Sequence, residues 1–335
     1  MKSRIGILYL YFFFVISLLL ILAAGLRSGG DPDYVNYRDI YVKSLTESIL
    51  VEPFYLYINV IFNQLNIPFE FLIFSIAFVS IILKCIVFYK RSFYYLSALF
   101  IYICTIFVQF DLIAIRQGLA VSFIMLAFHF IKNRNLSILM VISASLFHAS
   151  ALIMIPILFL AKIEYKEKYI FSFYIAVFLM TQFKVTLPVD NLLFLIPGIP
   201  LFIIEKLKIY SSYADASILS YKQLLILLFS ILVYFYYRTN NFVKYMCVLY
   251  WFGCSISIIF SQIGDIAYRL KWYFLFSEIF FVPVFIYQFP VSMENKVILR
   301  FIKIVFLIIV LALLYLLPCL NFIDSVHERN STLIF

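Results

Sequence analysis

Charged residues are scarce in this chain of 335 residues, since Asp, Glu, Lys and Arg together make up 13% of it. The sequence also holds only 8 Gly, 3 His and 2 Trp. Soluble domains carry about 25% charged residues, so the scarcity excludes an ordinary soluble fold. No Gly-rich nucleotide loop occurs, and no pair of acidic residues at helical spacing suggests a divalent-metal site. We therefore expect no cofactor and no metal.

The cysteines show no metal-binding or redox pattern. They stand at positions 85, 104, 247, 254 and 319, and no C-x-x-C pair occurs. Most lie inside apolar blocks, where cysteine acts as a small apolar side chain. The formal net charge of +9 bears on membrane topology and on contact with anionic headgroups. It does not indicate binding to nucleic acid.

Apolar residues dominate what is present. The hydrophobic share is 65%, with 40 Phe and 26 Tyr, and the mean hydropathy is +1.06. The apolar blocks are too long for barrel strands, which span about ten residues of alternating pattern. Backbone groups in lipid must be bonded within the segment, so the blocks are helices. The fold class expected is an all-α polytopic membrane protein in a single integral membrane domain, residues 1–335.

The blocks predict about eleven transmembrane helices, within a range of about ten to twelve. The first block is long for a signal peptide and is counted as a span. One block, 191–204, is short and broken by Pro197, Gly198 and Pro200. The others are 5–26, 69–89, 93–110, 112–131, 136–161, 169–187, 221–237, 243–262, 270–289 and 299–318.

Basic residues set the predicted topology. Lys2 and Arg4 place the N-terminus inside, and the clusters 90–91 and 132–134 share that side. Residues 27–52 then form an external loop, and residues 53–67 a short re-entrant or interfacial helix. If 53–67 crosses instead, about twelve spans result and the later sides invert. Further on, we expect 162–168 and 205–220 outside, 238–244 inside and the C-terminal tail 319–335 outside.

Polar chemistry is concentrated in the first external loop, which carries Arg27, Asp31, Tyr34 and Tyr37. Its glycines suggest that it moves, and we expect it to act as an outer lid. Ionisable groups inside spans are costly and mark candidate sites. Arg116 stands about one and a half turns inside its predicted helix, roughly 7 Å deep. Its alternative roles are snorkelling to the surface or pairing with Asp111.

His148 lies near the middle of its predicted helix among small residues. A neutral histidine there can act as a general base, and its alternative is a core histidine bonded to a nearby hydroxyl. A third polar cluster holds Arg269 and Tyr273, and Tyr213 adds an aromatic ring on the same predicted side. Arg269 could equally anchor the chain at the membrane interface.

Three arginines from separate outer regions, Arg27, Arg116 and Arg269, suit a substrate with concentrated negative charge. Arginine favours bidentate phosphate recognition. A diphosphate on a lipid carrier is such a group, and arginines would stabilise it as it leaves. The expected reaction is a metal-independent transfer from a lipid diphosphate donor.

At these residues the chain resembles the EpsG-like family of Wzy-type polysaccharide polymerases. The resemblance rests, in order, on Arg27 to Tyr37, Ile115-Arg116-Gln117-Gly118, Phe147-His148 and Tyr268-Arg269 with Tyr273. It implies a multi-pass enzyme of the bacterial inner (plasma) membrane that makes O-antigen, capsule or exopolysaccharide. Such enzymes join oligosaccharide repeat units carried on undecaprenyl diphosphate, transferring the growing glycan to a sugar hydroxyl of the next unit.

The resemblance also implies residue roles. Arg116 and Arg269 would hold diphosphate, and His148 would deprotonate or orient the acceptor hydroxyl. Arg27 and Asp31 would close the site. Binding roles would fall to Gln117, Tyr213 and Tyr273, and Tyr34 and Tyr37 would stack on sugars. Expected partners are the lipid-linked oligosaccharide, the bilayer, and a chain-length regulator and flippase of the same pathway.

Other functions stay open at this point. A transporter or flippase of lipid-linked units would need charges along a path open to both sides, and no internal repeat suggests one. A membrane acyltransferase would need a histidine reached from the cytoplasm. A non-catalytic subunit of a synthesis complex is the remaining alternative.

Overall fold

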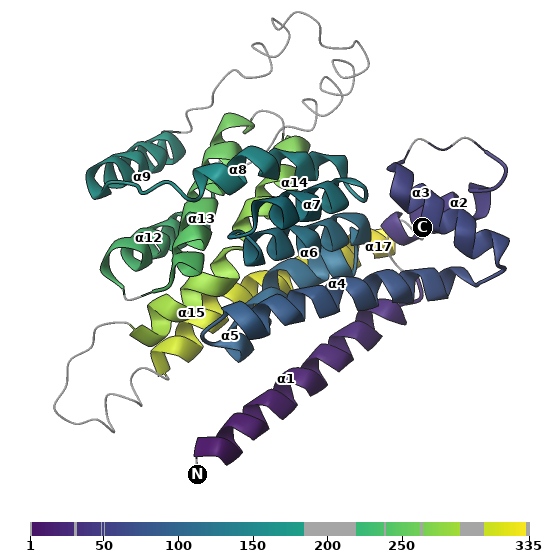
Figure 1. The fold of residues 1–335 in the computed structure, drawn as a ribbon, viewed down its shortest axis with the longest axis horizontal. Coiled ribbons are helices and arrows are strands. Elements are labelled where there is room, and N and C mark those ends of the chain that lie inside the picture. The colour runs from purple at the N-terminus through teal and green to yellow at the C-terminus, as the bar shows by residue number, and fades with distance from the viewer. Residues whose placement is uncertain are drawn as a thin grey trace, which may run out of the picture. The chain divides into compact units, whose positions relative to one another are not determined.

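The computed structural model (Figure 1) describes residues 2–29, 32–47, 49, 51–183, 219–237, 239–261, 264–288 and 305–332. Every element in these ranges is a helix, which confirms the all-α prediction for this part of the chain. The chain divides into two compact units. Unit 1 comprises Met1–Ile155 and Pro290–Phe335, and unit 2 comprises Pro156–Phe289. Asp31, Tyr213 and the predicted span 191–204 lie outside the described residues.

Unit 1 is built around the long helix α4, which packs against α1 and α6. A π-helix, η1, continues α5, and a short 3-10 helix, η2, follows α7. The bounds are α1 Lys2–Gly25, α2 Pro32–Lys43, α3 Pro53–Gln64, α4 Phe69–Arg91, α5 Tyr95–Tyr102, η1 Ile103–Asp111, α6 Ile115–His129, α7 Arg134–Ser145, η2 Ala149–Ile153, η3 Ala312–Leu316 and α17 Leu317–Thr332.

Unit 2 contains α13 packed against α12, α14 and α15. A serine–glutamine capping box opens α12, since Ser220 accepts from the backbone of Gln223 and Gln223 bonds back. The bounds are α9 Glu167–Gln182, α12 Tyr221–Tyr236, α13 Asn241–Ile259, α14 Gly264–Leu275 and α15 Glu278–Gln288. Helix α8, Met154–Leu160, contains the boundary between the units.

Helices α1 and α4 run antiparallel. Midway along α1, the Phe13 ring lies 6.4 Å from that of Tyr89, near the end of α4. At its other end, a Cβ on Gly25 would stand 3.2 Å from the Cα of Phe74. Glycine is therefore required there for the two backbones to approach this closely. The chain leaves α1 and enters α4 at the same end of the pair.

Helices α2 and α3 lie at that end of α4 (Figure 1). Each has 12 residues, which span about 18 Å at 1.5 Å per residue. That is less than the roughly 30 Å of a hydrocarbon core. The short helix expected at 53–67 is present as α3, and its re-entrant or interfacial placement stays a prediction.

The opposite end of unit 1 is basic. Arg91 closes α4 and donates from Nε to Nδ1 of His129, the last residue of α6, at 2.9 Å. The clusters 90–91 and 132–134 are therefore on one side, as predicted, and the basic start of α1 joins them. By the positive-inside rule this end is expected in the cytoplasm.

The described residues hold four helices long and apolar enough to cross a membrane, or up to five if a bent pair forms one span. The four are Gly6–Gly25, Phe69–Arg91, Asn241–Ile259 and Val305–Ser325, and the pair joins Arg269–Leu275 to Glu278–Gln288. Other predicted spans are interrupted by non-helical residues or by a change of helix type. The predicted span 136–161, for example, is divided into α7, η2 and α8. The count of about eleven spans stays a prediction.

One part of the predicted topology is wrong. In unit 2 the backbone N–H of Tyr165 donates to the Tyr234 hydroxyl at 3.2 Å, and the Tyr236 hydroxyl bonds Glu167. The 162–168 loop and the turn before α13 therefore lie at the same end of unit 2, whereas we expected opposite sides. An even number of crossings must separate them, because the hydrogen bonds cannot reach across a bilayer.

The C-terminal segment also differs from the expected tail. Helix α17 continues to Thr332, and the candidate span in this region runs to Ser325. Length and hydropathy alone define this candidate span, so the boundary at residue 319 stays a prediction.

Candidate functional site

Arg116 is the second residue of α6. The predicted long helix is interrupted between Asp111, where η1 ends, and Ile115, where α6 begins. The predicted depth of about one and a half turns inside a helix is therefore wrong. The guanidinium lies in the first turn of α6, at the end of unit 1 where α2 and α3 lie. A π-helix just before it matches the frequent placement of such distortions at functional sites.

Arg116 pairs with Glu52. Its Nη1 lies 2.5 Å from Oε2 of Glu52, and the two side chains are 25% and 18% exposed. Glu52 is the residue before α3, and Pro53 opens that helix. The alternative of pairing with Asp111 is wrong, since Asp111 binds Lys84 instead. Sequence reasoning missed Glu52, although a proline at the first helical position marks it as a helix-capping position.

Two tyrosine rings flank the Arg116 guanidinium. Its Cζ lies 5.6 Å from the ring centroid of Tyr37 and 5.4 Å from that of Tyr55. The two rings meet edge to face at 6.0 Å. Arginine is attracted to the faces of aromatic rings, so the pair fixes the guanidinium where it stands. Tyr55 was not predicted as a site residue.

Arg27 joins the same group. Its Cζ lies 5.7 Å from the ring centroid of Tyr34, and its guanidinium nitrogens are buried. Tyr34 belongs to the same buried cluster as Tyr37 and Tyr55. Arg27 and Arg116 thus both lie against rings of one aromatic cluster. The structure brings together four of the predicted residues, namely Arg27, Tyr34, Tyr37 and Arg116.

Burial, with a smaller effect of Asp33, raises the pKa of Tyr37 to about 12, although Arg116 and Arg27 act in the opposite direction. Burial also raises the pKa of Tyr55. Both phenols are therefore protonated at neutral pH. They can donate hydrogen bonds but are not suited to act as bases.

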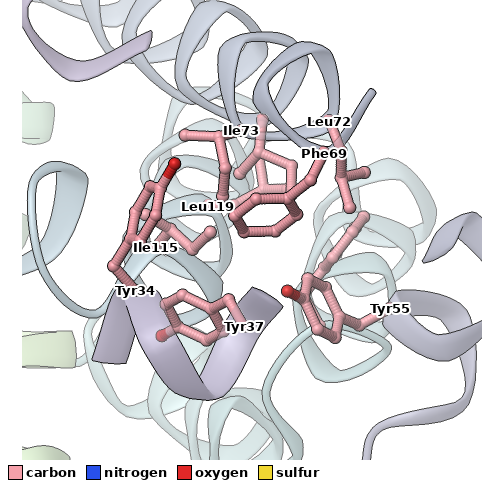
Figure 2. Close-up of a cluster of buried hydrophobic side chains, with 10 residues drawn as sticks. Tyr34, Tyr37, Tyr55, Phe69, Leu72, Ile73, Ile115 and Leu119 are labelled. Atoms are coloured by element: carbon pink, nitrogen blue, oxygen red, sulfur yellow. The ribbon is translucent and has the colours of Figure 1, made fainter. Parts of the chain in front are cut away.

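An aromatic and aliphatic cluster supports these residues (Figure 2). Phe69, at the start of α4, packs edge to face on Tyr34 with centroids 5.3 Å apart. Tyr34 and Tyr37 are themselves buried, so their rings are not presented to a sugar. Their rings instead contact the guanidinium groups of Arg27 and Arg116 and hold them in place. The members are Tyr34, Tyr37, Tyr55, Phe69, Leu72, Ile73, Ile76, Ile115, Leu119 and Phe147.

An apolar groove of about 450 Å³ adjoins the cluster. Its lining comes from α3, α4, α6 and the end of α7, and includes Phe54, Leu119 and Phe147. The two serines of the lining, Ser75 and Ser143, donate to carbonyls of their own helices. The groove surface is therefore hydrocarbon, and it begins one helical turn from Arg116, at Leu119.

His148 does not lie within a helix. Helix α7 ends at Ser145, and His148 has extended backbone angles immediately before η2. The prediction of a mid-helix position is thus wrong, because the chain is interrupted there. Its Nδ1 lies 2.6 Å from the Ser150 hydroxyl, which orients the ring. The preceding Phe147 stacks on Phe123 at 5.8 Å, which places His148 beside the groove.

The remaining predicted residues are separate from this group or buried. Gln117 follows Arg116 but is buried. Arg269 and Tyr273 belong to α14 of unit 2, so their convergence with Arg116 stays a prediction. Over the described ranges, no three His, Cys, Asp or Glu side chains gather where a metal ion could be held.

A buried ion pair below the site was not predicted. Lys84 Nζ lies 2.7 Å from Asp111 Oδ1 and also donates to the Gly118 carbonyl at 2.9 Å. Tyr102 and Ser80 donate to the same carboxylate, at 2.7 and 2.6 Å. The network joins α4, the end of η1 and the first turns of α6. A lysine inside the block 69–89 was the signal in the sequence that could have revealed it.

The comparison with known families gives one match. The family model described as EpsG matches residues 10–323, nearly the whole chain. The match runs from α1 into α17. It includes all the residues of the arginine and tyrosine cluster, namely Arg27, Tyr34, Tyr37, Tyr55 and Arg116. No curated protein and no solved structure matches the chain.

Proposed function

The chain belongs to the EpsG family, and from this premise we propose that it is a polysaccharide polymerase that uses lipid-linked repeat units. The donor is a growing glycan on undecaprenyl diphosphate, and the acceptor is a sugar hydroxyl of the next lipid-linked unit. The reaction takes place at the outer face of the bacterial inner membrane and needs no metal. Membership in the family and the apolar helices support a membrane protein of polysaccharide biosynthesis.

The observation that carries the proposal is the placement of Arg27 and Arg116 against rings of one buried cluster, Arg27 over Tyr34 and Arg116 over Tyr37 and Tyr55. A diphosphate spreads negative charge over several oxygens, and arginine matches it with paired donors. When the glycan leaves the lipid diphosphate, negative charge on the leaving oxygen increases. Arginines held in place in advance stabilise that charge without rearrangement.

The apolar groove supports a lipid substrate. It lies next to Arg116 and presents a mostly hydrocarbon surface. A substrate with an anionic head and an isoprenoid chain would place the head on the arginines and the first part of the chain in the groove. Undecaprenyl diphosphate has both parts.

His148 is the proposed general base. The Ser150 hydroxyl orients its ring, and histidine is the side chain that most often removes a proton in general base catalysis. Arg269, Asp31, Gln117, Tyr213 and Tyr273 keep their proposed substrate-binding roles. Gln117 and Tyr273 are buried as the structure stands, so their roles require that substrate binding uncovers them.

The test is polymer length in the native host. We expect Arg116→Ala and His148→Ala to leave single, unpolymerised repeat units at the cell surface while the protein stays in the membrane. Arg116→Lys keeps the charge but loses the paired donors, and should restore activity only in part. Arg38, exposed on α2, is the matched control, and Arg38→Ala should make polymer of normal length.

The same variants separate the alternatives. A transporter of lipid-linked units would lose delivery of the units to the outer face, so no single units would appear there. Normal chain length in Arg116→Ala, with protein at wild-type abundance, would remove Arg116 from the proposed site.

A further inference from the structure

A second pocket lies at one end of unit 2, where the 162–168 loop meets the end of α12 and the start of α13. Its volume is about 330 Å³. The proposed polymerase site does not use these residues. The lining residues are Ala161, Lys162, Ile163, Glu164, Tyr165, Tyr234, Phe235, Asn241, Lys244 and Tyr245.

The loop that forms one wall is fixed in place. The Tyr165 hydroxyl donates to the Leu160 carbonyl at 3.0 Å, and the Tyr165 backbone N–H donates to the Tyr234 hydroxyl at 3.2 Å. Glu167, just after the loop, bonds the Tyr236 hydroxyl. Contacts 69 residues apart in sequence thus hold an exposed loop against α12. Because the loop is already held in place, a ligand that binds to it loses little free energy to ordering the loop.

The second wall is aromatic. Trp251 of α13 packs on both tyrosines, with its ring 5.8 Å from Tyr165 and 5.0 Å from Tyr234. Its indole N–H donates to Ser230 at 2.8 Å, which anchors the cluster to α12. Lys244 extends over the Tyr234 ring, with Nζ 5.4 Å from the centroid. The ring therefore sets the direction of the Lys244 ammonium group.

The charges of the pocket favour a singly charged anion. Lys162 and Lys244 come from different elements, and over the described residues neither forms an ion pair. Glu164 is the one carboxylate of the lining and offsets one of the two ammonium charges. The Asn241 amide and the tyrosine hydroxyls add uncharged hydrogen-bonding groups. A phosphodiester carries one negative charge and accepts several hydrogen bonds, so it matches this set.

The position of the pocket along the helices identifies the source of the phosphodiester. Asn241 is the first residue of α13, and Asn241–Ile259 is a candidate membrane span. The pocket therefore opens where the span begins, at the depth of lipid headgroups. Lysines and tyrosines are the residues expected at that depth. We infer that this pocket binds the phosphodiester headgroup of an anionic phospholipid, of which phosphatidylglycerol is the probe.

The experiment uses the purified full chain in nanodiscs of phosphatidylcholine doped with phosphatidylglycerol, and measures lipid retained per protein by native mass spectrometry. Lys162→Gln and Lys244→Gln should each weaken phosphatidylglycerol retention about ten-fold, because each removes one charged hydrogen bond. Lys244→Arg keeps the charge and should retain the lipid. Lys168→Gln is the matched control, since Lys168 lies over Tyr169 and is not part of the lining.

Each outcome decides the inference. Selective loss in the two lining variants, with unchanged melting temperatures, supports it. Equal retention in all variants overturns the pocket as a binding site. Displacement of the lipid by soluble glycerol phosphate at similar concentration overturns the lipid assignment in favour of a free phosphate ester. Binding of a neutral oligosaccharide in preference to either overturns the phosphate assignment. None of these readouts depends on polymerase activity.

Discussion

Lys84 and Asp111 form a fully buried ion pair, with Lys84 Nζ 2.7 and 2.9 Å from the two carboxylate oxygens. The side chains are 0% and 1% exposed. Burying a charge is costly unless its bonds are complete. Here Ser80 and the Gly118 carbonyl also accept from Lys84, so its donors are used. The pair joins α4 to the end of η1, just before the interruption that precedes α6. It therefore fixes the position of the first turn of α6, which carries Arg116.

Removing one partner of this pair should destabilise the protein strongly. Lys84→Met and Asp111→Asn should each lower the free energy of unfolding by about 3–5 kcal/mol, because each leaves an unbalanced buried charge or donor set. The double variant should lose less than the two singles together, with a coupling of about 1–3 kcal/mol. The measurement is unfolding of the purified protein in mild detergent.

Lys43→Met is the comparison for this cycle. Lys43 and Glu47 are 3.8 Å apart and more than half exposed. Such surface pairs contribute about 0.5 kcal/mol or less, so the loss should be small. Strictly additive effects of Lys84→Met and Asp111→Asn would contradict direct coupling.

Gly118→Ala should be destabilising although alanine favours helices. A Cβ on Gly118 would stand 2.7 Å from the Phe110 carbonyl oxygen. Backbone must move to accept it, at a cost of about 1–3 kcal/mol. Gly6 has nothing within 4 Å of such a Cβ, so Gly6→Ala should be neutral or slightly stabilising. Melting temperatures of the two variants make the comparison, and equal values would contradict the close contact.

The stability of unit 1 should depend on pH through Tyr37. Its pKa is raised from the ordinary 10.0 to about 12, chiefly by burial. A raised pKa means that the protonated phenol is favoured in the folded state. The contribution is complete below pH 10 and is lost as the pH rises through about 12. The loss approaches about 3 kcal/mol, since one pKa unit corresponds to about 1.4 kcal/mol.

Tyr37→Phe removes this titration. The stability difference between wild type and variant should be constant below about pH 10 and should shift against the wild type above it. The difference in tyrosinate absorbance between wild type and Tyr37→Phe, recorded over the same pH range, isolates the ionisation of Tyr37. A difference independent of pH up to about 12 would contradict the burial of the Tyr37 hydroxyl.

Filling the apolar groove should impair polymer formation without unfolding the protein. Leu146 lines the groove and is 39% exposed, so Leu146→Trp places a large ring at its opening. We expect shorter polymer at unchanged protein abundance. Leu139 lies on α7, the helix that Leu146 directly follows, and is 52% exposed, but it does not line the groove. Leu139→Trp should therefore leave polymer length unchanged, and equal effects of the two would argue against the groove as a substrate site.

Much of unit 1 could be predicted from local patterns. Apolar blocks long enough to span the hydrocarbon core as a helix predicted α1 and α4. The basic residues at 90–91 and 132–134 predicted that these two segments lie on the same side of the membrane. The short polar block around Arg27, and an arginine within an apolar stretch at position 116, predicted two residues that the fold brings together. In each case the cost of polar groups in lipid makes the residue type alone informative.

The failures have a common cause. Asp111 is close to Arg116 in sequence, yet it binds Lys84, while Arg116 binds Glu52, 64 positions away. Partners of charged groups depend on which helices pack together, and local spacing does not contain that information. The break at His148 and the side of the 162–168 loop were missed for the same reason, since both depend on contacts distant in sequence.

The amino-acid sequence by itself determined that this protein is helical and membrane-embedded, because hydrocarbon length and the need to bond every backbone group leave no other choice. It also showed which charged side chains carry a high free-energy cost in lipid and are therefore candidates for a function. Only the tertiary structure decided their partners. Packing of α2 and α3 against α4 and α6 selected Glu52, Tyr37 and Tyr55 for Arg116, and burial selected Asp111 for Lys84.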